Sequence, residues 1–150
     1  MLSQTIFTAS PEETEQAGAA LARRLTEDAA LPRVIALFGD LGVGKTAFVR
    51  GFCREISPLS TVRSPTFAIV NEYRRGSIPL FHFDMYRIES EDDLYSIGFD
   101  DYLEAGGISL IEWSEHVTDS LPPHYLAVTI EKVAAEVNAR TLTIEERRSV

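Results

Sequence analysis

The 150-residue chain is 45% hydrophobic and 25% charged, which is typical of a globular protein, and we expect one domain over residues 1–150. Its net charge of -9 argues against a protein whose main role is to bind a nucleic-acid backbone unaided. The single cysteine, Cys53, cannot form an internal disulfide, so we interpret it as a buried apolar residue. The N-terminus lacks the features of a signal peptide, and no apolar run approaches the roughly 20 residues of a membrane helix. We therefore expect a cytoplasmic protein without membrane association.

The first third of the chain predicts a strand, a helix and a buried strand. Residues 5–8 form a short predicted strand, and Ser10 then opens a helix, with Pro11 at its first position and Glu13 completing a capping box. One face of this helix carries Ala17, Ala20, Leu21 and Leu25. The apolar run at residues 33–38 is typical of a strand in a buried parallel sheet.

The rest of the chain predicts a helix at Lys45–Ile56, strands at 66–73, 80–83 and 108–111, and one brief acidic helix. Ser90 caps the acidic helix, and its inward residues are Leu94 and Ile97. Apolar residues alternate with polar ones around residues 126–130 and 142–144, which predicts an antiparallel pair. Together these elements predict an α/β fold, with a mixed sheet flanked by helices and antiparallel strands near the C-terminus.

Residues 39–46, Gly-Asp-Leu-Gly-Val-Gly-Lys-Thr, match the P-loop pattern G-x-x-x-x-G-K-[ST] between a buried strand and an amphipathic helix. Glycines let the backbone N–H groups point at phosphate oxygens, and the helix N-terminus adds a partial positive charge. The lysine neutralises the β- and γ-phosphates, and the threonine hydroxyl is a magnesium ligand. The pattern therefore predicts a P-loop NTPase-like site for a nucleoside triphosphate with Mg²⁺. The expected nucleotide contacts are Asp40, Leu41, Gly42, Val43, Gly44, Lys45 and Thr46.

A P-loop also needs an acidic residue at the end of a neighbouring strand, which holds magnesium directly or through water. Asp84 follows the strand at 80–83, and Glu112 follows the strand at 108–111. The residues alone leave both open as magnesium candidates.

Four further residues have two interpretations each. Thr66 is either a turn-capping residue or a switch that senses the γ-phosphate. Trp113 is either half-buried in the core or stacked on an adenine or a partner. We interpret His82 as a hydrogen-bonded structural residue rather than a base, and Arg87 either stabilises charge near the phosphates or pairs with local acids.

Four sequence blocks narrow the choice of protein: GDLGVGKTAFVRGF, SPTFAIVNEY, FHFDMYRI and SLIEWSE. In this order they resemble the bacterial TsaE (YjeE) family over residues 10–113, and the likeness is weak beyond that. This family supplies the small ATPase of the machinery that makes threonylcarbamoyladenosine beside the anticodon of certain tRNAs. The resemblance implies ATP and Mg²⁺ as cofactors, and hydrolysis that is slow alone and stimulated by partners. It implies TsaD and TsaB as those partners, an assembly that ATP turnover resets between rounds, and contact with tRNA only through the complex.

The resemblance also implies roles for single residues. It implies catalytic roles for Lys45, Thr66 and Asp84, magnesium contacts for Thr46 and Glu112, and a place beside the nucleotide for Trp113. In this interpretation Glu112 is the magnesium-associated acid, and Asp84 orients the attacking water. On the adenine side we expect Ser10, Thr14 and Arg140.

Two other functions fit a P-loop. A small-molecule kinase needs an acceptor pocket and usually an arginine-bearing lid, and the sequence has no arginine-rich insert long enough to form one. A GTPase would carry an Asn-Lys-x-Asp motif for its base, and the chain has none. We therefore predict an ATPase, with the kinase as the alternative.

Overall fold

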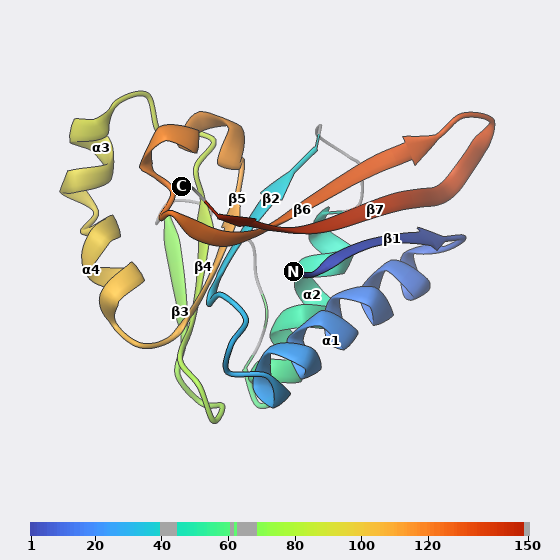
Figure 1. Ribbon diagram of the computed structural model, residues 1–150, viewed down its shortest axis with the longest axis horizontal. Coiled ribbons are helices and arrows are strands. Elements are labelled where there is room, and N and C mark those ends of the chain that lie inside the picture. The colour runs from blue at the N-terminus through green and yellow to red at the C-terminus, as the bar shows by residue number, and fades with distance from the viewer. Residues whose placement is uncertain (40–44, 61, 63–68, 149–150) are drawn as a thin grey trace.

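A mixed β-sheet with helices on both faces forms the body of the protein (Figure 1). The computed structural model describes residues 1–39, 45–60, 62 and 69–148. Within these residues the strands are β1 (Ser3–Thr8), β2 (Val34–Phe38), β3 (Val70–Tyr73), β4 (Leu80–Asp84), β5 (Ile108–Glu112), β6 (His124–Val133) and β7 (Glu136–Arg148). The helices are α1 (Pro11–Glu27), α2 (Lys45–Ile56), α3 (Glu91–Ser96) and α4 (Phe99–Glu104), with short 3₁₀ helices η1 (Ser114–His116) and η2 (Thr118–Ser120).

The strand order is β1-β7-β6-β2-β5-β4-β3. The central strand β2 is parallel to both β5 and β6, and β4 is parallel to β5. β3, β7 and β1 each pair in the antiparallel sense with a neighbour. The structure confirms the predicted mixed sheet and the antiparallel C-terminal pair, and it places the carboxyl ends of β2, β4 and β5 at one edge.

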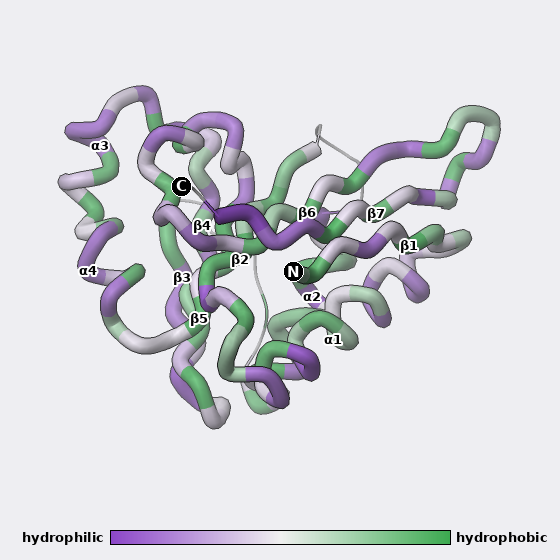
Figure 2. Tube along the Cα trace, in the orientation of Figure 1, coloured by the Kyte–Doolittle hydropathy of each residue, from purple (hydrophilic) through white to green (hydrophobic). Residues whose placement is uncertain are grey.

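Two hydrophobic cores cover the two faces of the sheet. Leu25 of α1, Phe52 of α2 and Leu110 of β5 belong to the first core, and Phe83 of β4 and Phe99 of α4 belong to the second. Because successive residues of a strand point to opposite faces, each central strand contributes to both cores. Figure 2 shows the resulting pattern, with hydrophobic residues along β2 and hydrophilic ones at the C-terminal end of β7. In the described part of the chain, no helix has both the length and the apolar composition needed to cross a membrane.

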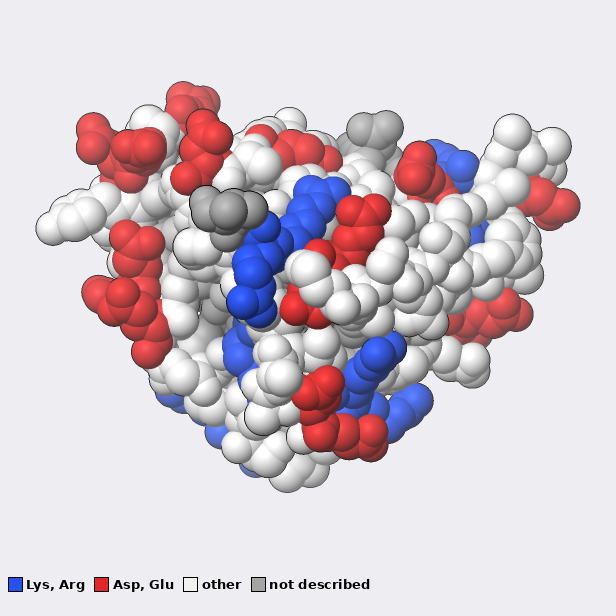
Figure 3. All heavy atoms as spheres, viewed as in Figure 1, with Lys and Arg blue, Asp and Glu red and all other residues white. Residues whose placement is uncertain are grey.

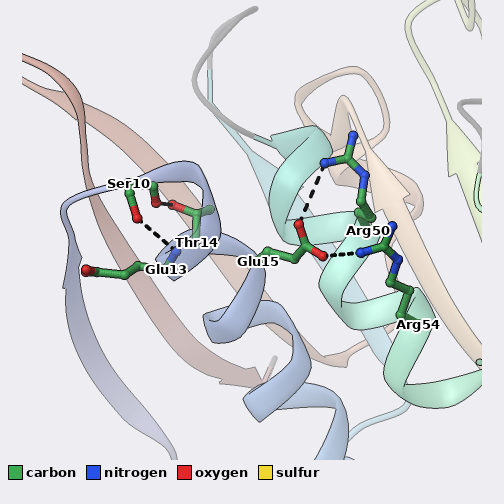
Figure 4. Close-up of polar contacts among 6 residues, drawn as sticks. All are labelled: Ser10, Glu13, Thr14, Glu15, Arg50 and Arg54. Carbon is green, nitrogen blue, oxygen red and sulfur yellow. Dashed lines mark hydrogen bonds and ion pairs between the residues drawn. The ribbon is translucent and has the colours of Figure 1, made fainter.

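Helix α1 begins as the capping residues predict (Figure 4). The Ser10 hydroxyl accepts a hydrogen bond from the N–H of Glu13 at 3.2 Å. The Glu13 carboxylate accepts from the N–H of Ala9 at 3.0 Å, one residue before the cap. Both bonds satisfy N–H groups at the entrance to the helix, which fixes where α1 starts.

Glycines allow α1 and α2 to approach closely. A Cβ atom on Gly18 would lie 2.1 Å from the carbonyl oxygen of Phe48, and one on Gly51 would lie 1.8 Å from that of Glu15. Figure 4 shows the polar contacts beside this crossing, where Glu15 pairs with Arg50 at 3.7 Å and with Arg54 at 2.5 Å. The close crossing holds the N-terminus of α2 in place against α1.

Three predictions about the elements need correction. The acidic helix capped by Ser90 is present as α3 with Leu94 buried, but Ile97 lies just beyond its last residue and is only half-buried. The separate helix α4, which starts after Gly98 at φ 71°, was not predicted. Ala20 is exposed, and Gly18 takes its place on the buried face of α1. The strand predicted from residue 66 begins at Val70, and residues 66–68 lie outside the described part of the chain.

Candidate functional site

The candidate site lies at the edge of the sheet where three parallel strands end. Gly39 follows β2, Asp84 ends β4, and Glu112 ends β5, while Lys45 is the first residue of α2. The carboxyl edge of parallel strands is where ligands bind in open α/β sheets. The residues predicted from separate sequence blocks thus converge at one edge.

Lys45 is buried, with only 6% of its surface exposed. Its ammonium donates a hydrogen bond to the Gly39 carbonyl oxygen at 2.7 Å and lies 4.1 Å from the centre of the Trp113 ring. Both partners are neutral, and Lys45 forms no ion pair with any residue that the structure describes. A buried cation is costly without a counter-charge, so this ammonium is suited to an anionic ligand such as phosphate.

The backbone of Gly39, the first residue of the predicted P-loop, is hydrogen-bonded to the segment after β5. Gly39 has φ 134°, a conformation that side chains rarely adopt, which explains the glycine at this position. Its N–H donates to a carboxylate oxygen of Glu115 in η1 at 3.0 Å. Glu115 is not among the predicted site residues, although it lies within the block SLIEWSE.

Trp113 was predicted to be either half-buried in the core or stacked on an adenine or a partner, and the structure shows its surroundings. Its backbone has φ 58°, which is uncommon for a residue other than glycine, and its side chain is half-buried against the second core. The ring contacts Tyr86 and His116 at centroid distances of 5.0 and 5.6 Å. Trp113 is therefore partly a core residue, and its cation–π contact with Lys45 also places it beside the first residue of α2.

Asp84 and Glu112 are direct neighbours in the register of β4 and β5. One oxygen of Asp84 accepts the N–H of Tyr86 at 3.0 Å, and one oxygen of Glu112 is 2.5 Å from Nε2 of His82. By alternation both carboxylates belong to the α2 face of the sheet, the face of Leu110. Carboxylate oxygens are ligands that Mg²⁺ takes together with nucleotide phosphates, so both side chains stay candidates for a metal contact.

His82 and Cys53 both have the buried, structural character that the sequence predicts. His82 is 1% exposed and hydrogen-bonded to Glu112. Cys53 of α2 is fully buried, and burial first, then the charge of Glu112, raises the pKa of its thiol to about 12. A thiol with this pKa stays protonated at neutral pH, so Cys53 is no nucleophile.

The residues proposed for the adenine side lie together at the end of β1. Ser10 caps α1, and the Thr14 hydroxyl is buried and 2.7 Å from that of Thr8. Thr8 is in turn the register partner of Arg140, whose guanidinium donates to the carbonyl oxygen of Ala139 at 2.7 Å. Their contact with a nucleotide stays a prediction.

Several predicted site residues lie outside the described part of the chain. They are Asp40, Leu41, Gly42, Val43, Gly44 and Thr66. Thr46 is described: it is the second residue of α2, and its side chain is exposed. Within the described residues, no cluster of three or more His, Cys, Asp or Glu side chains could hold a metal ion by itself.

Comparison with known proteins gives a consistent result. The family "Threonylcarbamoyl adenosine biosynthesis protein TsaE" matches residues 8–142, which extends the likeness well beyond Trp113. A Bacillus subtilis protein named tRNA threonylcarbamoyladenosine biosynthesis protein TsaE is 37% identical, over 91% of this chain and 82% of its own length. Its namesake from Nostoc is 42% identical, over 75% of this chain and 68% of its own. The crystal structure of Bacillus subtilis YdiB superposes with a TM-score of 0.77 at 31% identity, covering 99% of this chain and 87% of that one.

Proposed function

Because the chain belongs to the TsaE family and so has a role in tRNA threonylcarbamoyladenosine biosynthesis, we propose that it is the single-domain, Mg²⁺-dependent ATPase of that process. It binds ATP at the P-loop, hydrolyses it slowly alone, and does so faster with its partners. Those partners are TsaD and TsaB, and ATP turnover resets their assembly between rounds of modification. The protein itself does not transfer the threonylcarbamoyl group.

The observation that carries this proposal is that the Lys45 ammonium is buried among neutral partners. Its buried ammonium has a carbonyl oxygen and an aromatic ring as partners, at the point where β2 gives way to α2. A phosphate oxygen would supply the negative charge that no described residue brings to this ammonium, and the first N–H groups of α2 would add hydrogen bonds. The sequence pattern around Lys45 supports the same ligand independently of the geometry.

The other predicted site residues contact the metal ion, the attacking water or the nucleotide. Thr46 and Glu112 would hold Mg²⁺, which when bound neutralises charge on the phosphates. We assign Asp84 to the attacking water, because it ends β4 directly opposite Glu112 at the strand ends. Thr66 senses the γ-phosphate, and Trp113 lies beside the nucleotide.

The charge distribution supports an indirect relationship with tRNA. Residues 88–131 contain 11 of the 23 acidic residues and no Lys or Arg, so the remaining residues have 14 basic and 12 acidic side chains. Figure 3 shows the acidic side chains gathered over α3 and α4. This surface repels a phosphate backbone, so the tRNA would be bound by the partner proteins.

The decisive test is the ATPase rate of the purified protein with and without the TsaB–TsaD assembly. We expect slow hydrolysis alone and clear stimulation by the assembly. Lys45→Ala should abolish the stimulated rate, and Lys132→Ala, which changes the other lysine of the chain, should retain it. A rate indifferent to the assembly would contradict the proposal, and rapid phosphorylation of a metabolite without partners would favour the kinase.

A further inference from the structure

His82 lies in the middle of β4, on the face of the sheet that α2 covers. Its register partner on β5 is Leu110, so Glu112 lies two residues further along β5 on the same face. The Nε2 atom of His82 is 2.5 Å from one carboxylate oxygen of Glu112. The imidazole is 1% exposed and the carboxylate side chain 13%, so little water competes for this bond.

The hydrogen bond uses only one end of the imidazole. An ionised carboxylate only accepts hydrogen bonds, so Nε2 of His82 carries the proton and donates it. Nδ1 is then an acceptor, and no described residue donates to it. Among the described residues, the only side-chain hydrogen bond of this buried ring is therefore the one between Nε2 and Glu112.

We propose that His82 is a positioning residue, whose Nε2–H group fixes one oxygen of Glu112 and leaves the other free for magnesium at the nucleotide. This inference rests on the proposed function, because it assumes that Glu112 contributes to the magnesium site. Groups that orient a metal-associated side chain commonly change metal affinity 10- to 100-fold when they are removed. The ring holds the carboxylate at the end of β5, where it would otherwise rotate between several conformers.

Three substitutions distinguish the effect of the Nε2–H donor from the effect of the shape of the ring. His82→Gln places an amide nitrogen the same number of bonds from the backbone as Nε2, whereas His82→Asn places one at the position of Nδ1. His82→Phe keeps the ring and removes both nitrogens. A matched control is His124→Asn, because His124 makes the same kind of contact with Glu146, at 2.7 Å, at the opposite end of β6 from the site.

The measurement is a titration of Mg²⁺ into the protein in the presence of ADP, followed by the fluorescence of Trp113. The quantity compared between variants is the Mg²⁺ concentration at which the fluorescence change is half complete. We expect His82→Asn and His82→Phe to raise it about 10- to 100-fold, and His82→Gln and His124→Asn to stay within about threefold of the wild type. ADP affinity in excess EDTA should be equal in all variants. Equal increases for Gln, Asn and Phe, or no increase in any, would overturn the proposal.

A second measurement uses the unmodified protein, in case the substitutions prevent folding. Nitrogen-15 spectra of the histidine rings should show a proton on Nε2 of His82 that exchanges slowly and whose resonance moves when Mg²⁺ is added to the ADP complex. A proton on Nδ1, or a resonance indifferent to Mg²⁺, would overturn the inference. A wild-type protein whose ADP binding ignores Mg²⁺ would overturn the proposed function as well, so the two failures are distinguishable.

Discussion

The ammonium of Lys45 lies 4.1 Å from the centre of the Trp113 ring, although 68 positions separate the two residues in the chain. The contact joins the start of α2 to the end of β5, and because Trp113 is the chain's only tryptophan, we expect its fluorescence to report on the surroundings of Lys45. A nucleotide that draws the ammonium away from the ring changes the surroundings of Trp113.

Lys45→Ala should weaken ATP binding about 10- to 100-fold, because a charge-assisted hydrogen bond to phosphate contributes roughly 1.5–3 kcal/mol. Titration of ATP against Trp113 fluorescence or by calorimetry measures the change. Lys132→Ala is the control, since Lys132 is exposed on β6. Unchanged ATP affinity in Lys45→Ala would mean that the triphosphate does not bind at this loop.

The two strand-end carboxylates should respond differently to neutralisation. Asp84→Asn should lower the stimulated ATPase rate about 100-fold or more and leave the affinity for Mg²⁺-ADP nearly unchanged, because it orients water in the reaction. Glu112→Gln should instead raise the Mg²⁺ requirement, because it removes charge from the metal site. Steady-state rates and Mg²⁺ titrations give both quantities. The reverse pattern would exchange the two roles.

The crossing of α1 and α2 should not tolerate added side-chain atoms. Gly18→Ala and Gly51→Ala place a Cβ atom 2.1 and 1.8 Å from backbone oxygens, so one helix must shift. We expect each to lower the free energy of unfolding by about 1–3 kcal/mol or more. Ala20→Ser, on the exposed side of α1, should change it by less than about 0.5 kcal/mol. Chemical denaturation measures all three, and an unaffected Gly51→Ala would show that the helices are further apart.

Cys53 should be inert in the folded protein and should destabilise it at high pH. Burial raises the pKa of its thiol from the ordinary 9.0 to about 12 in the folded protein, so the unfolded chain loses the proton first. The protonated thiol contributes fully to the free energy of unfolding below about pH 9. This contribution decreases as the pH rises towards 12, by up to about 1.4 kcal/mol per pH unit. The difference in unfolding free energy between the wild type and Cys53→Ala, measured from pH 7 to 11, isolates this effect. Rapid reaction of the folded protein with a thiol reagent at pH 8 would contradict the burial.

The sequence predicted the local elements well, since most depend on periodicity and caps. Ser10 and Glu13 marked the start of α1, and the apolar run at residues 33–38 marked β2. Helix α4 was not predicted, because six residues with one buried side chain, Phe99, are too short to show a helical period.

The contacts between distant segments could not be derived in the same way. Glu115 accepts from Gly39 across 76 positions, and His82 meets Glu112 across 30. Both contacts depend on β5 lying between β2 and β4, and hydrophobic periodicity does not determine strand order. The sequence therefore identified the acids at the strand ends, but not the contacts of Glu115 with Gly39 and of His82 with Glu112.

The most direct test of the account counts threonylcarbamoyladenosine molecules formed per TsaD in a reaction with TsaB, tRNA, the activated threonylcarbamoyl donor and this protein. With hydrolysable ATP we predict many modified tRNAs per TsaD. With Lys45→Ala or a non-hydrolysable ATP analogue we predict that the reaction stops near one. Equal multiple turnover with Lys45→Ala, or without this protein, would contradict the claim that ATP hydrolysis here resets the assembly.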